Sequence, residues 1–382
     1  MHAQLVNDFS NADLCEAWDD LLLQSDGANA QLTREWLGSW WETFGRNSRL
    51  ALVTVRDAGK ITGIAPLMVT KVIGKAGAAL KKLTFIGDGH TDYHDVLIAD
   101  ERREETVRTL VEFILRERES WDALCFQNFR GDSANLPVLR EAFKDTPLTL
   151  AQRVNIQSPY ISLEGTWADY YGAVGKNMRS DIRRRSNRLA RMGRAEFVRL
   201  HEVDDIDGIL ETLKAIHVKC RQMQGGRSWY IDPRRLAFAS RVLKRFGDRQ
   251  WLDLVLLKLN GRVIAYYLGF AYRSKVYFWN TGFDPEFSEV SPGKLLLHHW
   301  IKDSFAQGYR EFDFMVGEEP YKRQWTNAVR PNYELFVFKK TVRSRLFQCY
   351  HAYKPVLQRN RYLRAIGAGV KSRIANQPQG AL

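Results

Sequence analysis

The sequence predicts an α+β protein of two tandem domains, each a mixed and mostly antiparallel sheet flanked by helices, followed by a basic helical tail. An Asn260-Gly261 turn joins two apolar, β-branched and aromatic runs, which predicts a β-hairpin. A further strand-like run ends near Gly282, and apolar residues at helical spacing begin at Leu295. A similar order of elements occurs in the first half. We therefore expect domains at 1–165 and 166–340 and a tail at 341–382.

The loop before the predicted helix is suited to an anion. It reads Ser291-Pro292-Gly293-Lys294. Ser291 can act as the N-cap, and Pro292 suits the first helical position. Gly293 lets the backbone approach a ligand closely, and Lys294 adds positive charge where a helix N-terminus already favours anions. This loop therefore predicts a pyrophosphate site.

The order of this loop and helix, the strand Phe312-Asp313-Phe314, and the run from Gly317 through Tyr321-Lys322 to Trp325 resembles the CelD/BcsL group of GNAT acyltransferases. These are relatives of the FemAB and FemX aminoacyl and peptidyl transferases. The resemblance extends from about Trp36 to about Phe338. It implies acyl transfer from a coenzyme A thioester to an amine or hydroxyl. Such a reaction needs a cofactor cradle, a donor for the developing oxyanion, and a route for the acceptor proton.

The resemblance assigns the cofactor, acetyl-CoA or another acyl-CoA, to the C-terminal half. An oxyanion donor is expected among the backbone N–H groups between Trp279 and Phe283. No metal is expected, because the four cysteines are scattered and the adjacent His298 and His299 point apart on a helix. The predicted cofactor-binding residues are Phe283, Ser291, Pro292, Gly293, Lys294 and Leu295.

An internal repeat supports a duplicated domain. The segment from Val53 to Gly59 matches the segment from Val255 to Gly261. The first copy opens its equivalent helix with 99–105, which contains several carboxylates and no glycine at the turn. Carboxylates there would repel a phosphate. Only the C-terminal copy is therefore expected to hold the cofactor.

The first of two polar clusters is Thr91-Asp92-Tyr93-His94-Asp95. The resemblance implies that an acidic and aromatic pair here reaches the acceptor in the cleft between the domains. Asp92 and Tyr93 are therefore assigned to acceptor binding, and Asp95 to catalysis as a general base. Asp95 could equally be a turn or cap residue, and Tyr93 a packed aromatic.

The second cluster lies just after the strand Phe312-Asp313-Phe314. Glu318 follows Gly317 at the expected strand end, which suits a general base if burial raises its pKa. Lys322 matches the lysine of the family's Tyr-Lys pair, which helps to stabilise the transition state in FemX-like relatives. A salt bridge from Lys322 to Glu318 or Glu319 is the structural alternative. Tyr321 and Lys322 are assigned to catalysis with Glu318.

Three further residues are assigned to substrate binding. His217 and Arg221 lie four residues apart, which places them on one helical face at a position used by the family. A histidine on a helix can equally be structural. Trp325 closes the motif after Tyr321-Lys322 and is assigned with them.

The charge distribution argues against a simple nucleic-acid partner. The formal net charge is +13, but the segment from Lys339 to Leu382 holds ten Lys and Arg and no acid, so it supplies +10 of this. That tail either lies on an anionic membrane or packs its apolar stripe on the domain. The basic helix near 176–194 is either a solvated face or a place where Lys176, Arg179 and Arg183 contact a phosphorylated substrate or a nucleotide messenger.

These observations lead to one main hypothesis and two rivals. No signal peptide or membrane span is visible, so we expect a cytoplasmic protein that can contact the inner face of the membrane. The main hypothesis is an acyl-CoA-dependent N- or O-acyltransferase that acts on a sugar, a sugar-like compound or a lipid-linked saccharide in exopolysaccharide or envelope synthesis. One rival is a FemX-like transferase with an aminoacyl-tRNA donor and a cell-wall precursor as acceptor. The other is a non-catalytic regulator that binds a nucleotide or a membrane.

Overall fold

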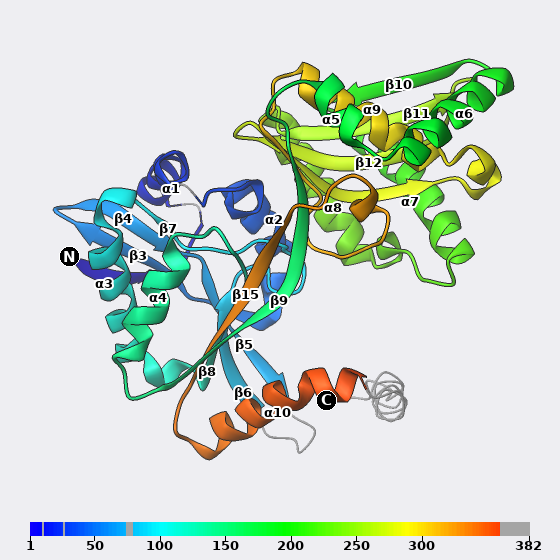
Figure 1. The fold of residues 1–382 in the computed structure, drawn as a ribbon. Coiled ribbons are helices and arrows are strands. Elements are labelled where there is room, and N and C mark those ends of the chain that lie inside the picture. Colours follow the sequence, from blue (N-terminus) through cyan, green and yellow to red (C-terminus); the bar gives the residue numbers. More distant parts are fainter. Residues whose placement is uncertain (10, 26, 74–78, 360–382) are drawn as a thin grey trace.

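One long sheet runs through both halves of the molecule. The structure, a computed structural model, describes residues 1–382 except 10, 26, 74–78 and 360–382. The long sheet has the strand order β10-β11-β12-β13-β14-β9-β15-β8-β6-β5-β2, and a smaller sheet has the order β1-β3-β4-β7. Helices pack on the faces of both sheets (Figure 1). The predicted α+β class is confirmed.

The N-terminal half contains both strands and helices. Its elements are β1 (His2–Val6), α1 (Ala12–Gln24), α2 (Arg34–Phe44), β2 (Ser48–Leu50), β3 (Leu52–Asp57), β4 (Lys60–Ala65), β5 (Leu67–Ile73), β6 (Ala79–Phe85), β7 (Leu97–Ile98), α3 (Arg103–Arg116), β8 (Ala123–Arg130), α4 (Asn135–Lys144) and β9 (Thr149–Ser162). Short 3₁₀ turns lie at Ala30–Leu32, Gly45–Asn47, Asp100–Arg102 and Arg118–Ser120.

The C-terminal half repeats a helix-flanked antiparallel arrangement. Its elements are α5 (Trp167–Ala173), α6 (Lys176–Met192), β10 (Ala195–Leu200), α7 (Ile206–Met223), α8 (Pro233–Asp248), β11 (Leu252–Leu259), β12 (Arg262–Tyr272), β13 (Lys275–Phe283), α9 (Pro292–Ala306), β14 (Glu311–Asp313), β15 (Val329–Phe338) and α10 (Val342–Arg359). Short 3₁₀ helices lie at Trp229–Ile231, Pro285–Val290 (η6) and Lys322–Gln324. The predicted hairpin is confirmed, because β11 pairs with β12 across Asn260-Gly261, both of which have positive φ.

Strands β9 and β15 join the two halves. β15 pairs along its whole length with β9 and on its other side with β8, while the end of β9 pairs with β14. Figure 1 shows the two strands running together between the halves. β9 is a single strand of 14 residues. Its partner lies far away in the sequence, so local alternation could not identify it.

The N-terminal helices pack against the C-terminal half. Trp18 and Trp36 are fully buried, and they share one core with Phe238 of α8 and Phe270 of β12. The Trp36 ring meets Phe238 edge-on at 5.1 Å. Trp36 therefore packs between the two halves. The opening strand β1, which pairs with β3, was not predicted.

Two neighbouring strands of the C-terminal half separate and leave a gap. β13 and β14 are parallel and pair only between Lys275 and Tyr277 on β13 and between Glu311 and Asp313 on β14. β14 ends there, whereas β13 continues to Phe283. The loop after β13 then leads into α9. The gap and the N-terminus of α9 therefore lie at the same end of the sheet.

The described part of the tail is the helix α10. Phe347 packs against a small core that includes Phe336 and Phe338, whereas Val342 and Leu346 are exposed. Of the two alternatives for the tail, packing against the domain is thus seen at Phe347 of α10. The tail arginines beyond residue 359 lie outside the described residues.

Candidate functional site

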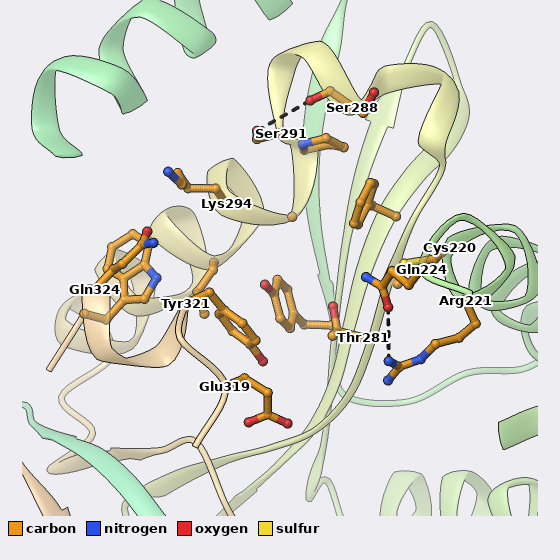
Figure 2. Close-up of a pocket in the computed structure, with 17 residues that line it drawn as sticks. Cys220, Arg221, Gln224, Thr281, Ser288, Ser291, Lys294, Glu319, Tyr321 and Gln324 are labelled. Atoms are coloured by element: carbon orange, nitrogen blue, oxygen red, sulfur yellow. Dashed lines mark hydrogen bonds between the residues drawn. The ribbon is translucent and has the colours of Figure 1, made fainter. Parts of the chain in front are cut away.

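A cavity of about 430 Å³ lies where β13 and β14 separate. α7, β13, the 3₁₀ helix η6, the start of α9 and the 319–325 segment all contribute to its walls. Figure 2 shows Arg221 and Gln224 on one side and Glu319 and Tyr321 on another. The lining residues are Cys220, Arg221, Gln224, Tyr267, Thr281, Gly282, Phe283, Ser288, Ser291, Pro292, Gly293, Lys294, Leu297, Glu319, Tyr321, Gln324 and Trp325. The volume is within the usual range for a small-molecule site.

The first turn of α9 opens into this cavity. The first amides of a helix lack partners inside the helix. Pro292 has no amide hydrogen, and the Lys294 amide donates to the Ser291 carbonyl at 2.9 Å. The Gly293 amide is therefore the donor of this turn that remains for a ligand. A Cβ at Gly293 would make only ordinary contact with Tyr267 at 3.7 Å, so its lack of a side chain leaves open space at the cavity wall.

Ser291 does not cap α9 in the predicted way. Its backbone is left-handed, with φ of 46°, and its side chain makes no capping hydrogen bond to the helix. Its hydroxyl instead lies 3.5 Å from the Ser288 carbonyl. Ser291 therefore shapes the turn through its backbone, and it lines the cavity.

Two backbone amides of β13 in the range predicted for the oxyanion donor point into the gap. The Asp284 amide donates to Ile264 of β12 at 2.8 Å. Because donor direction alternates along a strand, the Gly282 amide also points to β12, and the Thr281 and Phe283 amides point away from it. They point to the side from which β14 has departed. Thr281 and Phe283 both line the cavity.

Gly282 allows α7 to reach the cavity. A Cβ at Gly282 would lie 2.8 Å from the Tyr266 ring and 3.4 Å from the His217 backbone. The close packing of α7 on β13 places Cys220 and Arg221 in the cavity wall. The Arg221 guanidinium donates to Gln224 at 3.1 Å. Arg221 is thus at the site predicted for it.

Positive charge surrounds the start of α9. The Lys294 ammonium lies 3.0 Å from the Asp181 carboxylate of α6, which also accepts from Arg184 and Arg185. Burial works to raise the pKa of Asp181, but these hydrogen bonds hold it well below its ordinary value. One carboxylate is shared by three cations, so the group keeps a net positive charge that favours an anion.

Lys322 and Glu319 form an ion pair next to the cavity. Lys322 is only 4% exposed, and its ammonium lies 2.9 Å from Glu319 and donates to the Val316 carbonyl at 3.1 Å. Gly317, with φ of 125°, makes this possible, because a Cβ there would lie 2.5 Å from the Glu319 carboxylate. The ion pair is one of the two alternatives considered for Lys322 from the sequence. Glu319, not the predicted Glu318, lines the cavity.

Asp92 brings the N-terminal half to this ion pair. Burial raises the pKa of Asp92 to about 7, and the nearby Lys322 charge works against this rise. The negative charges of Asp313 and Glu319 add to this rise in pKa, so Asp92 lies close to both carboxylates as well as to Lys322. The Asp92 and Tyr93 amides both donate to the Gln31 side chain, which fixes the loop. The two polar clusters predicted from the sequence are thus brought together through Asp92.

Tyr93 is a buried aromatic with a polar partner. Its hydroxyl donates to Asp313 at 2.7 Å, and Asp313 also accepts from the Met315 amide at 2.7 Å. Arg330 lies 3.4 Å from Asp313 and 2.8 Å from Glu311. Burial raises the pKa of Asp313, while the Arg130 and Arg330 charges oppose this rise. Tyr93 does not line the cavity, so in the structure it joins the halves beneath the site.

Four other predicted residues lie away from the cavity. Asp95 is buried, accepts from Ser133 at 2.6 Å and Asn135 at 2.9 Å, and so holds the start of α4. Leu295 is in the core beneath α9, and Glu318 is exposed. His217 is buried against Ser228, with 2.8 Å between Nδ1 and Oγ. Burial lowers the pKa of His217 to about 4, with Arg221 adding to the effect, so the ring is neutral.

Tyr321 and Trp325 line the cavity as predicted. Burial raises the pKa of Tyr321 far above its ordinary value, and Tyr267 and Glu319 add to this, so the hydroxyl keeps its proton. Asp181 was not singled out from the sequence, although a lone acid in the arginine run of α6 was the available signal. Thr281 was included only through the range Trp279 to Phe283 given for the oxyanion donor.

Comparison with known proteins identifies a GNAT-like fold. Residues 176–323 match the family described as an acetyltransferase (GNAT) domain. The fold is consistent with tandem GNAT-like domains, as predicted. It is similar to the crystal structure of FemX, with a TM-score of 0.63, 12% identity, and coverage of 94% of this chain and 99% of that one.

Two further structures are similar to the whole chain. L-PGS from Bacillus licheniformis has a TM-score of 0.55 at 12% identity, with 96% of this chain and 99% of that chain covered. A C-terminal domain from Agrobacterium fabrum, assigned to a lysylphosphatidylglycerol synthetase, has a TM-score of 0.54 at 13% identity, with 90% and 96% covered. At these identities the likeness shows the fold alone. No curated protein sequence matches the chain.

The described residues contain no cluster of three or more His, Cys, Asp or Glu side chains placed to hold a metal ion. Within the same residues, no helix is both long and apolar enough to cross a bilayer.

Proposed function

We propose that the protein transfers an acyl group from acyl-CoA to an amine or hydroxyl, and that the acceptor is a sugar or sugar-like compound, free or lipid-linked. The observation that carries the donor assignment is the cavity between β13 and the 319–325 segment. It is lined by five of the six residues predicted to bind the cofactor: Phe283, Ser291, Pro292, Gly293 and Lys294. The acceptor class and the setting in exopolysaccharide or envelope synthesis rest on the CelD/BcsL resemblance.

The donor fits the cavity for chemical reasons. The Gly293 amide, the α9 N-terminus and the cations around Lys294 suit a diphosphate. The Thr281 and Phe283 amides would stabilise the oxyanion that forms when the acceptor attacks the thioester carbonyl. Tyr321 keeps its proton, so its hydroxyl can donate a hydrogen bond to the departing sulfur.

The acceptor would enter from the N-terminal half. Asp92 has a pKa of about 7, which suits a base that removes a proton from the attacking amine or hydroxyl near neutral pH. Lys322 lies beside it and is buried, so its charge can oppose negative charge that builds up during transfer. Asp92 takes the base role here because Glu318 is exposed and Asp95 has its partners elsewhere.

Calorimetry with coenzyme A tests the donor site. In the variant Gly293→Glu, the new carboxylate faces the diphosphate, and affinity should fall at least about 100-fold. An acid in the first turn suits the helix dipole, so the fold should be preserved. The matched control is Ala12→Glu, which adds the same carboxylate at an exposed position in the first turn of α1, away from the cavity. Equal affinity in wild type and Gly293→Glu would refute the assignment.

The donor class needs a second assay. Free thiol released from acetyl-CoA should rise when amino sugars or sugar alcohols are added as acceptors. The aminoacyl-tRNA alternative predicts instead that label moves from charged tRNA to a cell-wall precursor, with no thiol released. A sample active only with charged tRNA would overturn the acyl-CoA proposal.

A further inference from the structure

The basic helix α6 lies beside the proposed cofactor pocket. It packs against α9 and the 3₁₀ helix η6, and its Asp181 contacts Lys294 in the pocket wall. Only Ile182 and Leu189 of α6 are buried. The helix is thus held at the pocket mouth by few apolar contacts, and most of its arginines remain at the surface.

The arginines of α6 fall into two groups. Arg184 and Arg185 are paired with Asp181, and Arg188 with Glu289. Within the described part of the chain, no ion pair is found for Arg179 or Arg183. The Nε of Arg179 is also shielded from solvent and has no hydrogen-bond partner among the described residues. A buried guanidinium nitrogen without an acceptor is costly, so it points to an anion that would complete the site.

Arg179 and Arg183 lie next to an aromatic path that leads to the pocket. Burial raises the pKa of Tyr171, and the charges of both arginines oppose that rise, which places them near its ring. The Tyr171 ring is 5.0 Å from His298 of α9, and His298 is 6.4 Å from Trp325 in the pocket wall. A ligand leaving the pocket past Lys294 and Trp325 would reach this surface next.

We propose that Arg179 and Arg183 form a phosphate subsite that binds the phosphomonoester on the adenosine end of the coenzyme A donor. Two guanidinium groups suit a phosphomonoester, because each can donate two parallel hydrogen bonds to its oxygens. The half-buried Tyr171 and Trp167 rings, stacked at 4.8 Å, provide an aromatic surface for the adjoining base. This assignment rests on the proposed function and adds residues outside α9 and β13.

The test compares coenzyme A with 3′-dephospho-coenzyme A by calorimetry. Wild type should bind coenzyme A roughly 10- to 100-fold more tightly, as expected for charge-assisted hydrogen bonds. Arg179→Gln and Arg183→Gln should lose most of this preference while binding the dephospho form as wild type does. The control is Arg191→Gln, an exposed residue on the same helix about 18 Å along its axis from Arg179. It should keep the preference.

The outcomes separate this inference from the proposed function. If wild type binds both forms equally, the subsite is refuted and the acyl-CoA donor stands. If wild type binds neither form, the proposed function itself fails. If Arg179→Gln weakens the binding of both forms of coenzyme A equally, Arg179 stabilises the fold and does not bind the phosphate, and the subsite is again refuted. If Arg191→Gln loses the preference as well, the effect is general charge and the subsite is refuted.

Discussion

The hydroxyl of Tyr93 donates a 2.7 Å hydrogen bond to Asp313, a residue 220 positions later in the chain. Asp313 is fully buried, so this bond joins the two halves in a place that water does not reach. Tyr93 also follows Asp92 directly, and Asp92 is the group of the N-terminal half that lies near Lys322. The bond therefore links the pairing of the halves to the position of the proposed base.

Tyr93→Phe tests this link. The substitution removes one hydroxyl and leaves a buried acceptor on Asp313, which should lower the free energy of unfolding by about 1 to 3 kcal/mol. Urea denaturation measures this. Tyr333→Phe is the control, because Tyr333 is half-buried and no hydrogen bond of its hydroxyl is found among the described residues. If both variants have the stability of wild type, the bond is not important for joining the halves.

The two adjacent acids give a matched comparison. Both acids are exposed, but Glu319 lines the cavity and pairs with Lys322 at 2.9 Å, whereas no ion pair of Glu318 is found among the described residues. We expect Glu319→Gln to lower acyl transfer about 10-fold, since Lys322 loses the group that holds it. Glu318→Gln should be within twofold of wild type. A larger effect of Glu318→Gln than of Glu319→Gln, measured by thiol release, would support Glu318 as the general base predicted from the sequence.

Lys322→Met should separate catalysis from binding. The substitution removes a buried cation that would stabilise the negative charge of the transition state. The rate should therefore fall about 100- to 1,000-fold, while coenzyme A affinity stays near that of wild type. Arg323→Met is the neighbouring control, as Arg323 is exposed. The regulator hypothesis predicts the opposite: Lys322→Met keeps function in cells, and charge reversal of 183–188 destroys it.

The pKa of Asp92 gives a pH prediction. Burial raises this pKa from its ordinary value to about 7, so between about pH 4 and 7 the folded protein holds a proton that the unfolded chain has lost. Stability from this group is therefore present at low pH and is lost as pH rises through 7. Relative to Asp92→Asn, wild type should lose about 4 kcal/mol of unfolding free energy over this range, because the pKa differs by about three units.

Urea titrations at several pH values measure this difference, with the exposed Asp145→Asn as the control that should follow wild type. Parallel wild-type and Asp92→Asn curves would show that Asp92 titrates normally. Acyl transfer should show the complementary trend, rising as the Asp92 carboxyl ionises near pH 7.

Local patterns predicted much of the C-terminal half. The Asn260-Gly261 turn, the loop before α9 and the run to Trp325 are short signals with a clear physical cause, and they appear where expected. What local patterns missed depends on distant partners. β15 lies within the segment expected as the C-terminal domain, yet it pairs with β8 of the N-terminal half. The domain boundaries remain a prediction.

The site residues divide in the same way. The start of α9 follows from Pro292 and Gly293, and a strand leading into that helix places Phe283 at the cavity. The sequence suggested Asp95 as a base because its hydrogen-bond partners, Ser133 and Asn135, lie far along the chain and could not be identified from the local pattern. Glu318 and Glu319 could not be told apart, because the local sequence does not show the positive φ at Gly317 that gives the Glu319 carboxylate room beside Lys322.

A crystal soaked with acetyl-CoA tests the central claim most directly. The account predicts the diphosphate against the Gly293 amide, and the thioester carbonyl facing the Thr281 and Phe283 amides in the gap beside β13. The 3₁₀ turn at Asp100–Arg102, the matching position of the first half, should hold no ligand. Density for the diphosphate at Asp100, or an empty α9 N-terminus at saturating ligand, would contradict the account.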